Sequence, residues 1–342
     1  MTEQQLDMFG GATADSTAAK PSTDRRAASR RPRETRPTTD PHDLFEGQVR
    51  APRRRRRFTV DQLAERLGGI ASTLPRGIPH TVLAVVVLGV TLAEHSAANV
   101  TYEAIADSAH PATTAADILD GGVALTPQLW GHTDVLAEAL RSNVGDDDSE
   151  RAVGRLAETL AEADLDTTFG VDPDGHHERL GPDLLGELYS RLRSASGKKD
   201  RGAFYTPANV ALMMGEMTPP REGDNVADFS VGGGIMFWGA ASAMRRAELD
   251  PRTCTWFGID IDPVAVAITA VNALPWRLHD RVVLYVGNGL TTDINTMVEA
   301  EQQRLRAGRE RYRPIFEEIL AGARDRLASA EVSPPGAEDL SA

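Results

Sequence analysis

The chain has 342 residues and a formal net charge of −13, a size that suits one large domain or two ordinary ones. Its single cysteine, Cys254, excludes a disulfide framework and fits a reducing compartment, so we expect a cytoplasmic protein. The polar start of the chain shows no sign of a signal peptide. The apolar run 81–93 is too short to span a bilayer, so it predicts a buried helix and no membrane anchor.

The segment 1–57 differs in composition from the rest of the chain. It is rich in Ala, Thr, Ser, Pro and Arg and has almost no aromatic residues, so we expect it to be disordered. It holds 13 Lys and Arg against 8 Asp and Glu, although the whole chain is acidic. It ends in the run Arg53, Arg54, Arg55, Arg56 and Arg57. Such a run predicts either a salt-sensitive tether for DNA phosphates or a solvated tail that keeps the protein in solution.

The segment 58–196 has apolar residues at helical spacing, and it predicts an all-helical domain. The first helix should begin at Thr59 or Asp61. Further helices are expected at 80–94, 135–140, 152–165 and 182–194, with an acidic break at 146–148 between the second and third of these. The pair His176-His177 has no Cys or carboxylate spacing beside it, so we expect no metal site.

Four short pieces follow, each where the chain switches between strand and helix. They are Gly-Ala-Phe-Tyr-Thr-Pro at 202–207, Ala-Asp-Phe-Ser-Val-Gly-Gly-Gly at 227–234, Phe-Gly-Ile-Asp-Ile-Asp-Pro at 257–263 and Tyr-Val-Gly-Asn-Gly-Leu at 285–290. Strands are expected at 225–228, 254–259 and 281–286. Glycines in such turns let the backbone approach a ligand, and an acidic residue one βαβ unit later can accept bonds from ribose hydroxyls.

The helices between these strands have recognisable starts. Thr206 should cap a helix that has Pro207 in its first turn, and Asp262 should cap one that begins at Pro263. A further helix is expected at 235–249. The methionines of the first helix, Met213, Met214 and Met217, are more typical of a core than of a chemical role.

The ordered set of four pieces resembles the DNA amino-methyltransferases that modify adenine, above all the modification subunits of type I restriction systems. The resemblance is specific over about 180–290 and looser over 60–300. It implies a Rossmann-like domain that binds S-adenosylmethionine, a helical domain beside DNA, and DNA as a partner. The positions that match the cofactor site are Phe204, Tyr205, Thr206, Pro207, Asp228, Gly232, Gly234, Asp260, Ile261 and Asn288.

The resemblance also implies a role for each matched position. The segment 204–207 would fold over the methionine end of the cofactor, Asp228 would orient the methionine amine, and Gly232 and Gly234 would let the loop wrap around the ligand.

On the nucleoside side, Asp260 would hold the ribose hydroxyls and Ile261 would lie against the adenine ring. Asn288 would face the adenine amino group, where the family usually has Asp. Phe229 and Val231 depart from the usual Pro and Cys of the loop.

The catalytic motif of the family has no convincing counterpart in this chain. Adenine methyltransferases carry [Asn/Asp/Ser]-Pro-Pro-[Tyr/Phe] after their fourth strand, where the flipped base stacks on the aromatic ring. Ser333-Pro334-Pro335 is a near-match that lacks the aromatic residue and lies in a polar tail. The segment 299–329 predicts one or two charged helices instead. Their apolar face would hold Tyr312, Ile315, Phe316, Ile319 and Leu320.

We therefore expect an α/β chain with a disordered basic arm at 1–57, a helical domain at 58–196, an S-adenosylmethionine domain with an incomplete sheet at 197–300, and a helix with a disordered tail at 301–342. One hypothesis is half of a split methyltransferase, or part of a restriction-modification system, in which a partner polypeptide supplies the catalytic and target-recognition parts. Another is an inactive remnant that binds DNA and regulates. A third is an NAD-dependent enzyme, against which the Phe-Tyr-Thr-Pro segment argues.

Overall fold

The computed structural model describes residues 55–72, 84, 98–142, 144–164, 183–195, 206–278 and 281–331. All of them lie in the second of two compact units, Gly47–Ala342. The arm up to Arg54, most of the apolar run 81–93, the pair His176-His177, the residues Phe204 and Tyr205, and the segment Ser333-Pro334-Pro335 lie outside the described residues. The boundaries expected for the domains therefore stay predictions.

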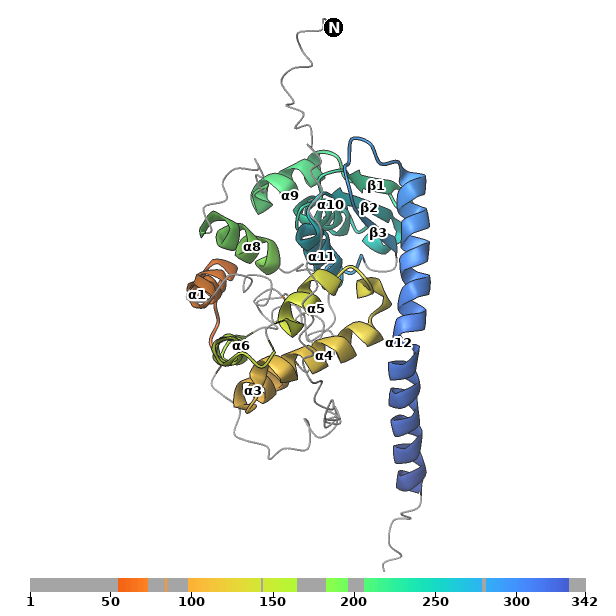
Figure 1. Ribbon diagram of the computed structural model, residues 1–342. Coiled ribbons are helices and arrows are strands. Elements are labelled where there is room, and N and C mark those ends of the chain that lie inside the picture. Colours follow the sequence, from red (N-terminus) through yellow and green to blue (C-terminus); the bar gives the residue numbers. More distant parts are fainter. Residues whose placement is uncertain are drawn as a thin grey trace, which may run out of the picture. The chain divides into compact units, whose positions relative to one another are not determined.

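The first half of the described chain is helical, as expected (Figure 1). Its elements are α1 (Val60–Ser72), α3 (Ala98–Asp107), α4 (Pro111–Leu125), the 3-10 turn η2 (Pro127–Leu129), α5 (Asp134–Arg141), α6 (Asp147–Ala161) and α8 (Leu184–Ala195). The start expected for α1 is confirmed. The Gln62 N–H donates to Thr59 Oγ1 at 3.2 Å and the Thr59 N–H donates to Gln62 Oε1 at 3.0 Å, a reciprocal cap. Leu63 and Leu67 are buried, and Ile70 packs against the same core.

A break separates α5 from α6 as expected, but Asp147 and Asp148 do not lie in it, because the acidic run 146–148 begins α6. Asp146 caps α6, because its Oδ2 accepts from the Ser149 N–H at 2.9 Å and from Ser149 Oγ at 2.8 Å. Asp147 and Asp148 lie in the first turn, where negative charge interacts favourably with the exposed N–H groups of a helix start. The helix consequently starts five residues before the apolar pattern that predicts it.

A parallel sheet with the order β1-β2-β3 forms the second half of the described chain. The strands are β1 (Asn225–Asp228), β2 (Thr255–Asp260) and β3 (Val282–Val286), which confirms the three expected strands to within one residue at each end. The accompanying helices are α9 (Ala208–Met217), α10 (Ile235–Arg246), the 3-10 turn η4 (Pro251–Thr253), α11 (Pro263–Asn272) and α12 (Ile294–Glu331). The chain thus has the Rossmann-like fold with an incomplete sheet that the sequence predicts.

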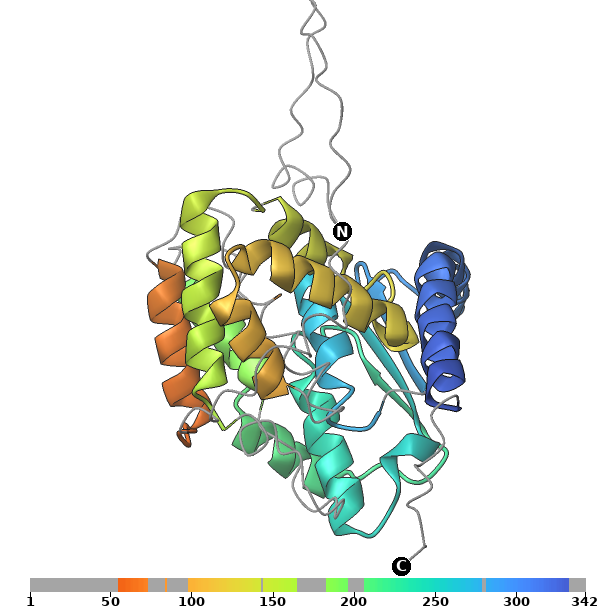
Figure 2. The ribbon, with the colours of Figure 1, turned by 90° about the horizontal axis from the view of Figure 1, so that it is seen from below.

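The two faces of the sheet pack against different helices, because side chains alternate along each strand. Trp256 and Leu284 belong to the main core, and the Trp256 ring meets the Phe237 ring of α10 edge to face at 5.3 Å between centroids. Phe257 and Ile259 point the other way and pack with Met297 of α12. Figure 2 shows α12 on one side of the sheet and α11 on the other.

In the part of the chain that the structure describes, β1 and β3 are the two edge strands of the sheet. Within the described residues β1 pairs with β2 alone, in the register Ala227 to Phe257. Asn225 and Ala227 are exposed, and Ala227 shares a face with Phe257. An exposed strand edge presents backbone N–H and C=O groups that another strand can pair with.

Helices α9 and α10 cross at glycines rather than at large side chains. A Cβ atom on Gly215 would overlap the Gly239 carbonyl, and one on Gly239 would overlap the Ala211 carbonyl. The backbones therefore touch on the face of α9 that carries Ala211 and Gly215. The core placement expected for the α9 methionines is consequently wrong. Met213, Met214 and Met217 are 54%, 46% and 74% exposed.

Helix α12 runs unbroken through Pro314. Its Tyr312 ring is buried and stacks on the Trp130 ring at 5.6 Å between centroids. Ile315 and Phe316 also pack against the core, whereas Leu320 is 52% exposed and does not belong to the expected apolar face. The side chain of Ile319 lies outside the description.

A partly buried charge cluster joins α12 to the turn between α4 and α5. Arg304 Nε donates to the Glu301 carboxylate at 2.8 Å, and its Nη1 donates to the carbonyl oxygens of Pro127, at 3.2 Å, and of Trp130. His132 Nε2 lies 3.4 Å from Glu301 Oε2. Burial lowers the pKa of His132. The cluster joins two elements about 170 residues apart in the sequence through charge-assisted hydrogen bonds.

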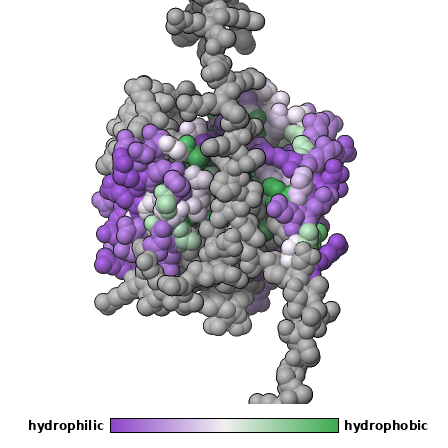
Figure 3. Space-filling view, turned by 60° about the horizontal axis from the view of Figure 1, so that its bottom comes forward, coloured by the Kyte–Doolittle hydropathy of each residue, from purple (hydrophilic) through white to green (hydrophobic). Residues whose placement is uncertain are grey.

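No helix in the described part of the chain is both long and apolar enough to cross a membrane. The face shown in Figure 3 is mostly hydrophilic where it is coloured, with small separate hydrophobic spots.

The charge cluster predicts an acid-sensitive contribution to stability. Burial alone would raise the pKa of Glu301, but hydrogen bonds from Arg304 and His132 outweigh it and lower the pKa from 4.5 to about 2. The ionised form therefore stabilises the fold at neutral pH, and this contribution is lost as the pH falls from 4.5 toward 2. Glu301→Gln should lower the free energy of unfolding at pH 7 by about 2 kcal/mol.

The measurement is urea unfolding followed by circular dichroism, with the exposed Glu299→Gln of the same helix as the control. The gap between wild type and Glu301→Gln should narrow below pH 4.5. A gap that stays constant with pH would contradict this account of the cluster.

Candidate cofactor site

The carboxyl ends of β1, β2 and β3 lie at one edge of the sheet, because parallel strands share their direction. Ligands of open α/β sheets bind at this edge. Asp228 ends β1, Asp260 ends β2, and Asn288 follows β3 by two residues. The structure therefore brings these three predicted positions to the same edge, although they are spread over 61 residues of sequence.

Two hydrogen bonds join the loop after β1 to the end of β2, and the first is from the Val231 N–H to the Ile259 carbonyl at 2.8 Å. The Gly232 N–H donates to Asp260 Oδ2 at 2.9 Å, and the Asp262 N–H donates to the other oxygen, Oδ1, at 2.9 Å. Both carboxylate oxygens are thereby fixed in direction, and each keeps lone-pair capacity for another donor. Asp260 is partly exposed, so that capacity is open to a ligand.

Two glycines of the loop have backbone angles that side chains rarely adopt. Gly232 has φ +55° and Gly234 has φ +87°. Gly234 stands at the N-cap of α10, as expected for the turn. A Cβ atom on Gly234 would lie 3.1 Å from both Thr269 and Trp276, so α11 and the residues just after it crowd the loop from behind. Thr269 Oγ1 also donates to the Gly232 carbonyl at 2.7 Å.

Asp228 and Asp260 place two carboxyl groups at the same edge. Burial raises the pKa of Asp228, the negative charge of Asp260 raises it further, and the bond from the Ser230 N–H at 3.0 Å acts in the opposite direction. A positively charged ligand group beside Asp228 would offset both of the causes that raise the pKa. The site consequently favours a cation near the end of β1.

Apolar side chains are exposed around these carboxylates. Ile261 is 78% exposed directly after Asp260, and Phe229 is 49% exposed directly after Asp228. A Cβ atom on Gly289 would overlap the Phe229 carbonyl, so the loop after β3 touches the loop after β1. The edge thus combines hydrogen-bond acceptors with an apolar surface suited to a flat ring.

The Asn288 side chain makes a hydrogen bond within its own turn. Its Oδ1 accepts from the Leu290 N–H at 3.0 Å, which shapes the turn after β3. Asn288 is exposed. The amide can still accept a second bond through the same oxygen and donate through its nitrogen.

Sequence reasoning missed two residues behind the loop. Asp183 Oδ1 accepts from the Asn272 side chain at 2.7 Å, and the same Asn272 nitrogen donates to the Gly233 carbonyl at 2.9 Å. Their separation of 89 residues hides this contact from any local pattern. The one available signal is that Asn272 and Thr269 are polar residues in an otherwise apolar helix.

Residues 181–303 match the family model described as N-6 DNA Methylase. This segment is similar to N-6 DNA methylases. The match covers the glycine loop, all three strands and the start of α12. It confirms the resemblance to adenine methyltransferases that the four sequence pieces indicate.

Two solved structures are similar to the chain at low sequence identity. The type I restriction-modification system methyltransferase subunit from Streptococcus thermophilus is 16% identical with a TM-score of 0.39, over 69% of this chain and 59% of that one. A modification subunit of a putative type I restriction enzyme from Vibrio vulnificus YJ016 is 17% identical with a TM-score of 0.41, over 66% and 56%. The chain spans less than two thirds of the length of either. No curated protein sequence matches it significantly.

The segment expected to cover the cofactor is only partly described. Pro207, not Thr206, stands at the cap of α9, and no side chain makes a capping bond there. The expected Thr206 cap is therefore wrong. Thr206 is partly exposed and Pro207 is exposed. The placement of 204–207 over a cofactor stays a prediction.

Three arginines of the basic run are described, and all are exposed. The backbone of Arg56 pairs with the end of α6, since its N–H donates to the Glu162 carbonyl at 2.7 Å and its carbonyl accepts from the Asp164 N–H at 2.9 Å. Arg57 Nε lies 3.6 Å from the Asp164 carboxylate. The end of the run is thus fixed to the helical part, and DNA contact by Arg53–Arg57 stays a prediction.

The crowding behind the glycine loop predicts an unequal response to two alanine substitutions. Gly234→Ala should lower the free energy of unfolding by about 1–3 kcal/mol from backbone strain, and further because Thr269 and Trp276 must move. Gly223→Ala is the matched control, because Gly223 has φ +84° but nothing within 4 Å of its Cβ position. Equal losses in thermal or urea unfolding would mean that the loop does not pack tightly on α11.

Proposed function

We propose that residues 181–303 bind S-adenosylmethionine at the carboxyl edge of β1, β2 and β3, as part of a DNA adenine methyltransferase. The observation that carries the proposal is the Asp260 carboxylate, oriented by the Gly232 N–H and followed by the exposed Ile261. An oriented acceptor beside an apolar side chain fits a nucleoside, whose ribose offers two donors and whose base offers a flat face.

The other groups of the site fit the rest of the same ligand. Asp228 would hold the methionine amine, which supplies the cation that its raised pKa favours. The left-handed Gly232 and Gly234 leave room for the ligand against the loop backbone. Asn288 would face the adenine amino group with its amide oxygen. When bound, the cofactor would supply a methyl group on a positively charged sulfur, and these side chains would bind and orient it.

DNA is the proposed substrate, and the cytoplasm is the proposed location. The family of the matched segment supports adenine in DNA as the methyl acceptor. The basic run Arg53–Arg57 would add attraction to phosphates without reading sequence.

A partner polypeptide is proposed to complete the sheet at β1. Asn225 and Ala227 are exposed on this edge, and in the described residues no strand pairs with it. In doubly wound folds the ligand crevice lies where the strand order reverses, which requires a strand on the far side of the first one. A strand supplied there could carry the Asn-Pro-Pro-aromatic motif that does not follow Asn288 in this sequence.

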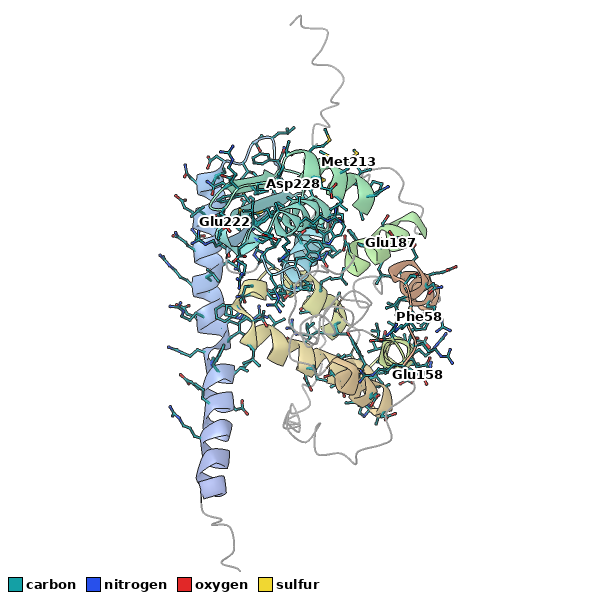
Figure 4. All side chains as sticks on the ribbon, turned by 180° about the vertical axis from the view of Figure 1, so that it is seen from behind. Phe58, Glu158, Glu187, Met213, Glu222 and Asp228 are labelled. Atoms are coloured by element: carbon teal, nitrogen blue, oxygen red, sulfur yellow. The ribbon has the colours of Figure 1, made fainter. Side chains whose placement is uncertain are left out.

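Cofactor binding is tested by calorimetry. S-adenosylmethionine and its demethylated product should bind, and NAD should not. Asp260→Ala should weaken binding by about 1–3 kcal/mol, because buried ribose hydroxyls lose their acceptor. Glu222→Ala is the control, since Glu222 precedes β1 and Asp228 ends it (Figure 4). Clear NAD binding with no heat from either sulfur ligand would refute the proposal.

Methyl transfer tests the partner. The chain alone should transfer little labelled methyl group to unmethylated DNA, because an adenine amine needs positioned acceptors and a stacking ring to react. Addition of a polypeptide that carries an Asn-Pro-Pro-aromatic motif, encoded beside this one, should restore transfer. Asp260→Ala in this chain should then abolish most of the gain. Strong transfer by the chain alone would rule out the need for a partner.

A further inference from the structure

One carboxylate oxygen joins the helical part of the chain to the glycine loop. Asp183 precedes α8, and its Oδ1 accepts from the Gly186 N–H at 2.7 Å, which caps that helix. The same oxygen accepts from Asn272 Nδ2 at 2.7 Å. Asn272, at the end of α11, is 4% exposed and also donates to the Gly233 carbonyl at 2.9 Å. A chain of hydrogen bonds therefore runs from the start of α8 through α11 to the loop.

The loop has little room to adopt another shape. A Cβ atom on Gly233 would lie 3.1 Å from Asp183 Oδ2 and 3.4 Å from the Gly186 Cα. The carbonyl oxygens of Gly232 and Gly233 both accept from side chains of α11, namely Thr269 and Asn272. Because C=O and N–H point in opposite directions across a trans peptide, the Thr269 bond turns the Gly233 N–H away from α11. The Asn272 bond likewise turns the Gly234 N–H away from α11, and that N–H donates to the Val231 carbonyl at 2.8 Å. The loop backbone is thus oriented from behind.

Burial of the Asp183 carboxyl group disfavours its ionised form. Burial raises its pKa to about 6, and Glu187 of α8 raises it further, while the bonds from Gly186 and Asn272 act in the opposite direction. Nearby, the Tyr189 hydroxyl of α8 donates to Asp262, the residue that caps α11. Asp183, at the start of α8, therefore contacts the loop after β1 through Asn272, and Tyr189 of α8 contacts the loop after β2 through Asp262.

We propose that Asp183 is a positioning residue, which holds the glycine loop in its ligand-binding shape through Asn272. Ligand affinity then depends on the position of α8. The proposal rests on the proposed cofactor function for its ligand, but not for the loop geometry. Helix α8 also packs on α1, so contacts through α8 connect the helical part of the chain to the cofactor site. A partner or DNA that shifts α8 would thereby change affinity for the cofactor.

The test distinguishes the bonds that Asn272 makes to Asp183 and Gly233 from the bond by which Asp183 caps α8. Asn272→Ala removes the bond to Gly233 and leaves the bond between Asp183 and Gly186. Asp183→Asn keeps an oxygen that can accept both bonds, so it is the conservative variant. Glu187→Gln on α8 is the charge control (Figure 4). The readouts are the affinity for S-adenosylhomocysteine by calorimetry and amide hydrogen exchange over 230–236, with 282–286 as the internal reference.

Asn272→Ala should weaken binding about tenfold and speed exchange in the loop, with exchange in α1 and α8 unchanged. Asp183→Ala should do the same if it folds, while Asp183→Asn and Glu187→Gln should remain within about twofold of wild type. Unchanged affinity and unchanged loop exchange in Asn272→Ala would overturn the proposal. If the wild type binds no ligand, the cofactor function fails, and the exchange data alone still decide whether Asn272 holds the loop.

Discussion

The bond between the Gly232 N–H and the Asp260 carboxylate is the constraint on which the candidate site depends. It fixes the loop after β1 against the end of β2, and it points the remaining lone pairs of Asp260 in defined directions. The bond requires a backbone that can turn with positive φ at Gly232 and Gly234, which side chains would strain. It also requires α11 behind the loop, because Thr269 and Asn272 hold the carbonyl groups of the same turn. A site of this kind is prepared before a ligand arrives, so the ligand does not have to order the loop.

The strands and the strand ends could be predicted from sequence because their signals are local. Asp228 and Asp260 each close a short apolar run, and Asp262 followed by Pro263 marks a helix start in two residues. The methionines of α9 could not be placed in this way. Both faces of that helix are apolar, and the choice between them is made by Gly239 on another helix, which allows only the Gly215 face to approach. The role of Asp183 was hidden for a related reason, since its partner lies 89 residues away.

The acidic run 146–148 shows that composition alone cannot tell a break between helices from the first turn of a helix. Three consecutive aspartates disfavour the interior of a helix, yet the same residues stabilise its first turn, where N–H groups have no partner within the helix. The Ser149 N–H bonding to Asp146 decides between these two outcomes in the structure. A polar residue three positions after a candidate cap was the signal that could have placed the start of α6 correctly.

A sheet of three strands needs support from the helices that pack on it. A parallel sheet is normally covered on both faces and flanked on both sides. Here α10 and α11 cover one face, and the first turns of α12 cover the other near Phe257 and Ile259. The ion pair of Arg304 and Glu301, with the bond from Arg304 to the Trp130 carbonyl, then holds α12 against the helical part of the chain. Within the described residues β1 and β3 are both edge strands, and α11 and α12 also contact β3. On β1, Asn225 and Ala227 are exposed. The edge beside the glycine loop is therefore the place where an added strand would gain hydrogen bonds and complete the crevice without displacing anything that the described fold already uses.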